Sequence, residues 1–80
     1  MNDRDVLERI GELVEEEHRL LERRSRGELA AEGHAQLDET QAKLDQCWDL
    51  LRQRRALREF GQDPDRAQVR SETVVERYEQ

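Results

Sequence analysis

Apolar residues recur every three to four positions through the first 26 residues of the chain, which is the spacing of one helical face. Asn2 or Asp3 can cap the start of this periodic stretch, and Gly27 suits a helix end in the left-handed conformation. The pattern predicts a first helix over about residues 3–26. The middle of its apolar stripe consists of Leu7, Ile10, Val14 and Leu21.

A second periodic stretch runs from about residue 30 to residue 60, and Gly61 ends it. Because so few residues join the two predicted helices, they should be antiparallel neighbours. Pairing them around the turn places Leu21 opposite Leu37 and Leu7 opposite Leu51. The apolar stripe of the second helix consists of Leu37, Leu44, Cys47, Trp48 and Leu51.

The sequence therefore predicts an all-α fold, an antiparallel two-helix hairpin over residues 1–62 that becomes a helical bundle on dimerisation. A short C-terminal tail over residues 63–80 follows as a turn with either a short helix or a loose end. Asp63 can cap such a helical turn, with Pro64 at its first position. Within the tail, Val74, Val75 and Tyr78 are candidates to cover part of the hairpin.

Two polar interruptions stand inside the predicted stripes. Glu17 lies level with Thr40 and Gln41, which predicts a polar layer that fixes the register of the hairpin. At the other end, Arg54 and Arg55 continue the inner face of the second helix. Two interpretations remain open there: ion pairs with Asp3 and Asp5, or a cationic binding site formed by Arg52, Arg54, Arg55 and Arg58.

A second apolar row, Leu50, Leu57 and Phe60, faces away from the predicted seam. Two packed helices bury only the seam between them, and a large exposed apolar surface is unfavourable in water. Either a second copy completes a four-helix bundle, or the C-terminal tail covers Leu50 and Leu57. The expected partner is thus the chain itself, as a homodimer or higher oligomer, and another protein is a further candidate.

The composition limits the partners and the cellular location that can be expected for the chain. Only 34% of the residues are apolar and 42% are charged, with a formal net charge of −6. The negative charge argues against general binding to nucleic acid or anionic membranes. No apolar run approaches the roughly 20 residues of a membrane span. A single cysteine and no recognisable signal peptide favour the reducing cytoplasm.

Little catalytic chemistry is visible. Glu15-x-x-His18 has the one-turn spacing of a helical metal pair, and Glu17 is a further carboxylate, but the second helix offers no inward acid at that level. Cys47 reads as a small buried hydrophobe, because no base or helix start lies near it. We therefore expect no enzyme and no cofactor, and a charged solvated face is favoured over a metal site at Glu15, Glu17 and His18.

The leading hypothesis is a non-enzymatic, homo-oligomeric protein-interaction module. A metal- or small-ligand-binding bundle, or weak nucleotide or RNA binding through the arginine cluster, are the alternatives. An apolar row beside an arginine cluster suits a helix or an acidic motif of a partner. The predicted partner surface consists of Gln46, Asp49, Leu50, Arg52, Gln53, Arg54, Arg55, Leu57, Arg58 and Phe60.

Three segments carry a family resemblance: Glu15–His18, the block LDQCWDLLRQRRA over residues 44–56, and Gly61-x-Asp63-Pro64-Asp65. With them, nearly the whole chain resembles the small actinobacterial domain-of-unknown-function family 2630. The chain departs from the family at residues 30–33, where a better capped and more acidic helix start is expected. The resemblance implies no activity, but it suggests a role beyond a solvated face for the polar residues of the block, Gln46, Asp49, Arg52, Gln53 and Arg55.

Overall fold

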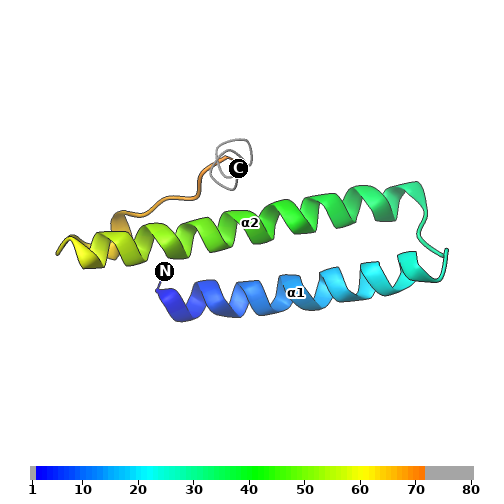
Figure 1. The fold of residues 1–80 in the computed structure, drawn as a ribbon, viewed down its shortest axis with the longest axis horizontal. Coiled ribbons are helices and arrows are strands. Elements are labelled where there is room, and N and C mark those ends of the chain that lie inside the picture. Colours follow the sequence, from blue (N-terminus) through cyan, green and yellow to red (C-terminus); the bar gives the residue numbers. More distant parts are fainter. Residues whose placement is uncertain (1, 72–80) are drawn as a thin grey trace.

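Two long helices form an antiparallel hairpin in the structure, a computed structural model that describes residues 2–71 (Figure 1). Helix α1 spans Asp3–Ser25, helix α2 spans Ala31–Glu59, and a short 3-10 helix, η1, spans Pro64–Arg66. The predicted all-α hairpin is confirmed, and no strand occurs in residues 2–71. The calls on Val74, Val75 and Tyr78 lie outside the described residues.

Local signals set the ends of the helices. Asn2 and Asp5 form a reciprocal capping box at the start of α1, in which each side chain accepts a hydrogen bond from the other residue's backbone N–H. Gly27 and Gly61 follow α1 and α2 with φ angles of 70° and 68°, a conformation that other residues adopt only with strain. These glycines allow the chain to turn sharply after each helix.

The start of α2 has no polar side-chain cap. Ala30 occupies the N-cap position and provides no side-chain hydrogen bond. Leu29 instead lies directly over Gly33, so close that a Cβ atom on residue 33 would collide with the leucine side chain. The helix therefore begins with an apolar contact in place of a polar cap, and a larger residue at position 33 would make the Leu29 side chain move.

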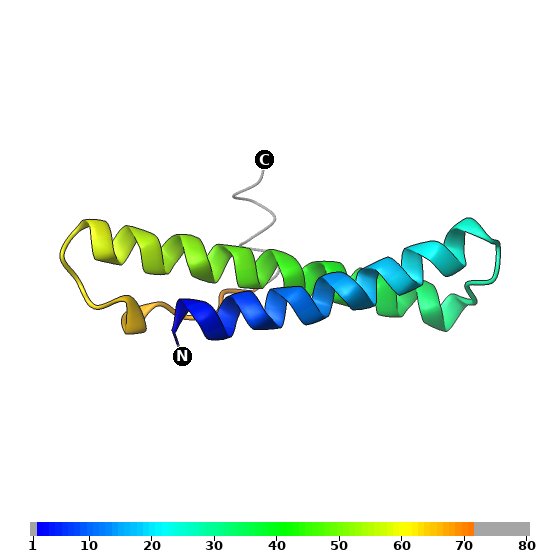
Figure 2. The same ribbon diagram turned by 90° about the horizontal axis from the view of Figure 1, so that it is seen from below.

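After α2 the chain turns back along the helix. Residues 62–71, which we call the return segment, contain η1 and then an extended stretch that runs beside α2 toward the middle of the hairpin (Figure 1). Figure 2 shows η1 at the open end of the hairpin, where the amino terminus also lies. There η1 packs against α2.

The buried seam follows a spacing of three and four residues in both helices. In α1 it contains Val6, Ile10, Leu13 and Leu20, and in α2 it contains Leu37, Thr40, Leu44, Leu50 and Arg54. Thr40, predicted as part of a polar layer, is buried and donates its hydroxyl hydrogen bond to the Gln36 carbonyl oxygen at 2.8 Å. Glu17 is half-buried. Of the predicted core residues, Ile10, Leu37 and Leu44 are buried, and Leu21, Cys47 and Leu51 are partly buried.

Three predicted core residues lie on the surface of the single chain, so that part of the prediction is wrong. Leu7 is 51% exposed, Val14 is 39% exposed and Trp48 is 46% exposed. The helices are rotated relative to the predicted seam, which brings Val6 and Leu13 inward. Leu50, predicted to face outward, is buried in the same cluster as these two residues. Ala67 of the return segment packs on that cluster and extends the buried side.

Candidate functional site

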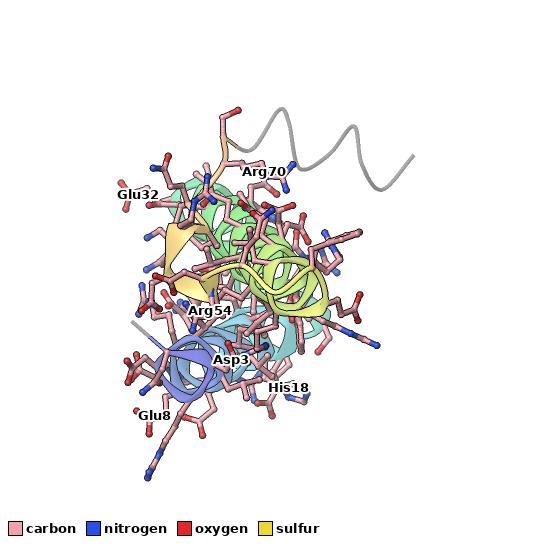
Figure 3. All side chains as sticks on the ribbon, turned by 90° about the vertical axis from the view of Figure 1, so that its left-hand side faces the viewer. Asp3, Glu8, His18, Glu32, Arg54 and Arg70 are labelled. Carbon is pink, nitrogen blue, oxygen red and sulfur yellow. The ribbon has the colours of Figure 1, made fainter. Side chains whose placement is uncertain are left out.

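Arg54 joins three parts of the chain at the open end of the hairpin (Figure 3). Its side chain is buried, its Nε donates to Asp3 at 2.6 Å, and its Nη1 donates to Asp65 at 2.9 Å. Arg58 donates a second hydrogen bond to Asp3. Charge-assisted hydrogen bonds of this kind are stronger than neutral ones. Arg54 thus fastens the start of α1 and η1 to the end of α2.

The same contacts shift the pKa values of the residues in this cluster. The hydrogen bonds from Arg58 and then Arg54 lower the pKa of Asp3, and the hydrogen bond from Arg54 lowers the pKa of Asp65. The two carboxylates in turn raise the pKa of Arg54. The ion pair between Arg54 and Asp3 is the structural alternative that the sequence left open. Arg55 lies apart from it and pairs with Glu59 at 3.1 Å.

A row of polar side chains on α2 binds the return segment. Asp49 is only 2% exposed, and its Oδ2 atom accepts a hydrogen bond from Gln53 at 2.9 Å and lies 3.2 Å from Nε of Arg70. Gln53 also donates to the carbonyl oxygen of Gln68 at 2.7 Å, and Gln46 donates to the carbonyl oxygen of Arg70 at 3.2 Å. A helical row at spacings of three and four residues thus holds an extended backbone.

These contacts revise the predicted partner surface. Gln46, Asp49, Gln53 and Arg54 contact the chain's own return segment. Leu50 is buried and Leu57 is half-buried, whereas Phe60 is 80% exposed. Of the remaining arginines, Arg58 binds Asp3, while Arg52 and Arg55 are exposed. The sequence analysis pointed to Gln46, Asp49 and Gln53 but did not predict that they bind the return segment of the same chain. The one sequence signal for this role was their spacing of three and four residues along α2.

An apolar hollow of about 270 Å³ lies between the helices on the side of the return segment. Arg9 lies near Cys47 on this side. Burial raises the pKa of the Cys47 thiol, and the nearby Arg9 charge only partly offsets the effect. Cys47 is therefore not set up as a reactive thiolate. The apolar lining consists of Val6, Leu13, Cys47, Leu50 and Val69.

The opposite side of the hairpin has no such cover within residues 2–71. Figure 3, a view along the length of the molecule, shows η1 on one side of the helix pair and His18 pointing outward on the other. The residues on this side share one helical face in α1, where they recur at spacings of four and three residues. We call this surface the open face, and it consists of Leu7, Gly11, Val14, His18 and Leu21 of α1 with Trp48 of α2. The helical spacing of α2 places Trp48 on the side away from Gln46 and Gln53, which bind the return segment.

Within residues 2–71, no group of three or more histidine, cysteine or acidic side chains is arranged to hold a metal ion. Glu15 and His18 are exposed on α1, and Glu17 beside them is half-buried. Neither α1 nor α2 combines the length and the apolar character that a membrane-spanning helix requires.

Comparison with known proteins adds a family but no activity. Residues 2–80 match the family model described as a protein of unknown function, DUF2630. Uncharacterised proteins of Mycobacterium tuberculosis and Mycobacterium bovis are 47% identical to this chain over 77 residues, which cover 95% of this chain and 88% of each relative. No solved structure matches the chain. Since the family model spans almost the whole sequence, the chain belongs to the DUF2630 family.

Proposed function

We propose that this chain is a non-enzymatic protein-interaction module that works as a homo-oligomer, with the open face as its contact surface. The observation that carries the proposal is Trp48, the only tryptophan of the chain, which is 46% exposed on the same side as Leu7 at 51%. Large apolar side chains clustered on one surface mark an interaction site more often than a solvated one. Aromatic residues in particular are enriched at interfaces.

The dimensions of the molecule support the same proposal. The molecule measures 49 × 25 × 16 Å, and the open face runs along its longest dimension. Such a side can supply the roughly 800 Å² per partner that a specific protein–protein interface buries. Two hairpins that meet through their open faces form a four-helix bundle, in which Trp48 and Leu7 leave water.

Charges at the edge of the open face fit a protein partner as well. Arg52 and Arg55 follow Trp48 at spacings of four and seven residues, so they border the apolar surface on α2. Both arginine side chains are exposed: Arg52 lies 4.0 Å from the buried Asp49, and Arg55 pairs with the exposed Glu59, a contact that is readily exchanged. These two arginines remain contact residues in the proposal. We place the module in the cytoplasm, where the free Cys47 stays reduced.

Light scattering of the intact chain tests the proposal. We expect a mass of at least twice 9.5 kDa at micromolar concentration. Gly11→Lys should yield the monomer mass, because it adds a charge to the open face at a position where a new Cβ atom meets nothing within 4 Å in the same chain. Ala35→Lys is the matched control, since Ala35 is an exposed small residue elsewhere on the hairpin.

Trp48 provides a second readout of the same experiment. Its fluorescence should shift to shorter wavelength as the protein concentration rises through the association range, because the indole leaves water. Gly11→Lys should abolish this shift while circular dichroism reports the same helix content. A wild-type chain with a mass of 9.5 kDa at every concentration would refute the proposal.

A further inference from the structure

The surface row of α1 has the sequence pattern of a second helix–helix seam. Leu7, Gly11, Val14, His18 and Leu21 alternate at spacings of four and three residues, the repeat that keeps one stripe facing a neighbouring helix. The seam toward α2 uses the same spacing one helical side away, through Val6, Ile10, Leu13 and Leu20. Helix α1 therefore carries two contact stripes, and residues 2–71 of the same chain occupy only one of them.

Gly11 lies in the middle of this second stripe. A Cβ atom added there meets no neighbouring atom of residues 2–71 within 4 Å, so no contact inside the described hairpin requires the glycine. A glycine inside a helix costs about 0.5–1 kcal/mol relative to alanine. A small residue at the centre of a stripe lets a second helix approach closely, which provides a reason for it there.

We infer that two copies associate through α1, with the two α1 helices antiparallel and the twofold axis between Gly11 and Val14. This geometry rests on the proposed function, since it specifies how the homo-oligomer forms. On α1 the open face has Leu7, Val14 and Leu21, whereas on α2 it has one apolar residue, Trp48. Contact between the two α1 helices therefore buries the most apolar surface.

Antiparallel pairing about this axis gives complementary layers. Gly11 lies opposite the partner's Val14, which places a small residue against a branched one. Leu7 lies opposite the partner's His18, and these layers repeat on both sides of the axis. A surface hollow lined by His18, Leu21 and Glu22 can receive the leucine side chain.

Charges favour the antiparallel direction. Arg4 borders the stripe near the beginning of α1 and Glu22 borders it near the end. Antiparallel pairing brings Arg4 of each copy beside Glu22 of the partner, so the same opposite-charge contact forms twice. Within the single chain Arg4 pairs with Glu8 at 3.3 Å, and the Arg4 side chain is 85% exposed, so it is free to reorient.

Trp48 closes one side of the same interface. Residue 47, its neighbour, packs against the cluster that contains Ile10, so Trp48 stands near the level of Ile10 on its own hairpin. With the axis between Gly11 and Val14, this level meets the partner's turn between Val14 and His18. The geometry thus accounts for the exposed indole as well as for the α1 stripe.

Cysteine cross-linking tests the geometry. In a Cys47→Ser background, which removes the only cysteine, Val14→Cys should be joined to its symmetry mate by a short bismaleimide. Leu21→Cys should not be joined, because in the antiparallel arrangement two copies of residue 21 lie about 25 Å apart at 1.5 Å per residue. Glu15→Cys, next to Val14 but off the stripe, is the second control.

The outcomes separate the geometry from the proposed function. Efficient cross-linking of Val14→Cys alone supports antiparallel α1 pairing. Cross-linking of Leu21→Cys at the same rate indicates a parallel arrangement and overturns the inference, although the module would still be an oligomer. A dimeric mass without any Val14→Cys product also overturns it, by showing that another surface joins the copies. A monomeric mass for the background chain refutes the inference and the proposed function together.

Discussion

The two long sides of the hairpin differ in how far their apolar side chains are shielded from water. On one side, the return segment covers the helix pair, with Ala67 on the core cluster and its backbone held by Gln46 and Gln53. On the other side, Leu7 and Trp48 stay about half exposed. A hairpin of two helices cannot bury both flanks by itself, and this chain covers one flank with its own residues. The flank that residues 2–71 leave uncovered is the one assigned to a second copy in the proposed function.

The largest expected difference is between two adjacent residues of α1. Leu13→Ala should destabilise the single chain by about 2–5 kcal/mol, because Leu13 is only 1% exposed and its removal leaves a cavity. Val14→Ala should cost about 1 kcal/mol or less, since Val14 lies on the open face. Urea unfolding at a concentration where the chain is monomeric measures both. Equal losses would show that the two sides do not differ.

A smaller effect is expected where the return segment is fastened. Asp49→Ala removes a buried carboxylate that binds Gln53 and Arg70, and leaving such partners unpaired costs about 1–3 kcal/mol. The return segment should then open more often. Trypsin should cleave after Arg66 and Arg70 faster than in the wild type. Asp38→Ala, at an exposed position of α2, is the control and should leave the cleavage rate unchanged.

Acid should loosen the covered side before the rest of the fold. Arg58 and Arg54 lower the pKa of Asp3 below its ordinary value of 3.8, and Arg54 does the same for Asp65. Because the folded-state pKa values are depressed, their stabilisation is fully present above pH 3.8 and is lost as the pH falls through the folded values. The thermal midpoint should therefore fall below pH 3.8. Arg54→Met should lower the midpoint at pH 7, and its difference from wild type should shrink in acid.

The smallest effects concern two glycines of opposite character. Gly11→Ala should stabilise the single chain by about 0.5–1 kcal/mol, since the position is helical and the space around it is open. Gly61→Ala should destabilise it by about 1 kcal/mol, because Gly61 has a φ of 68°. Chemical unfolding of the two variants under the same conditions gives both values. A destabilised Gly11→Ala would mean that the same chain covers the open face.

The hairpin could be predicted from the sequence because the helix periodicity and the short connection leave few other arrangements. The rotation of α1 could not, since Val6, Leu13 and Leu20 make as good a stripe as Leu7, Val14 and Leu21. The choice between them depends on what packs beside the seam. Ala67 supplies that contact. A single alanine outside a periodic apolar pattern does not show in the sequence that it will pack on the core.

The contacts of the polar residues of α2 could also be predicted only in part. The ion pair of Arg54 with Asp3 was one of two interpretations of the sequence, because the two residues lie level in the hairpin. The contacts of Gln46 and Gln53 were not predicted, because they are made to backbone carbonyl oxygens of the return segment. A backbone acceptor is offered by every residue, so the sequence of the bound segment carries no sign of it.

Arg54 also has a practical consequence for how the chain is handled. One guanidinium holds Asp3 near the amino terminus and Asp65 beyond the second helix. Any fusion or trimming that disturbs the first turn of α1 will therefore reach a segment some sixty positions further along the chain. A purification tag at the amino terminus would therefore sit next to the Arg54 ion pairs and could weaken the attachment of η1.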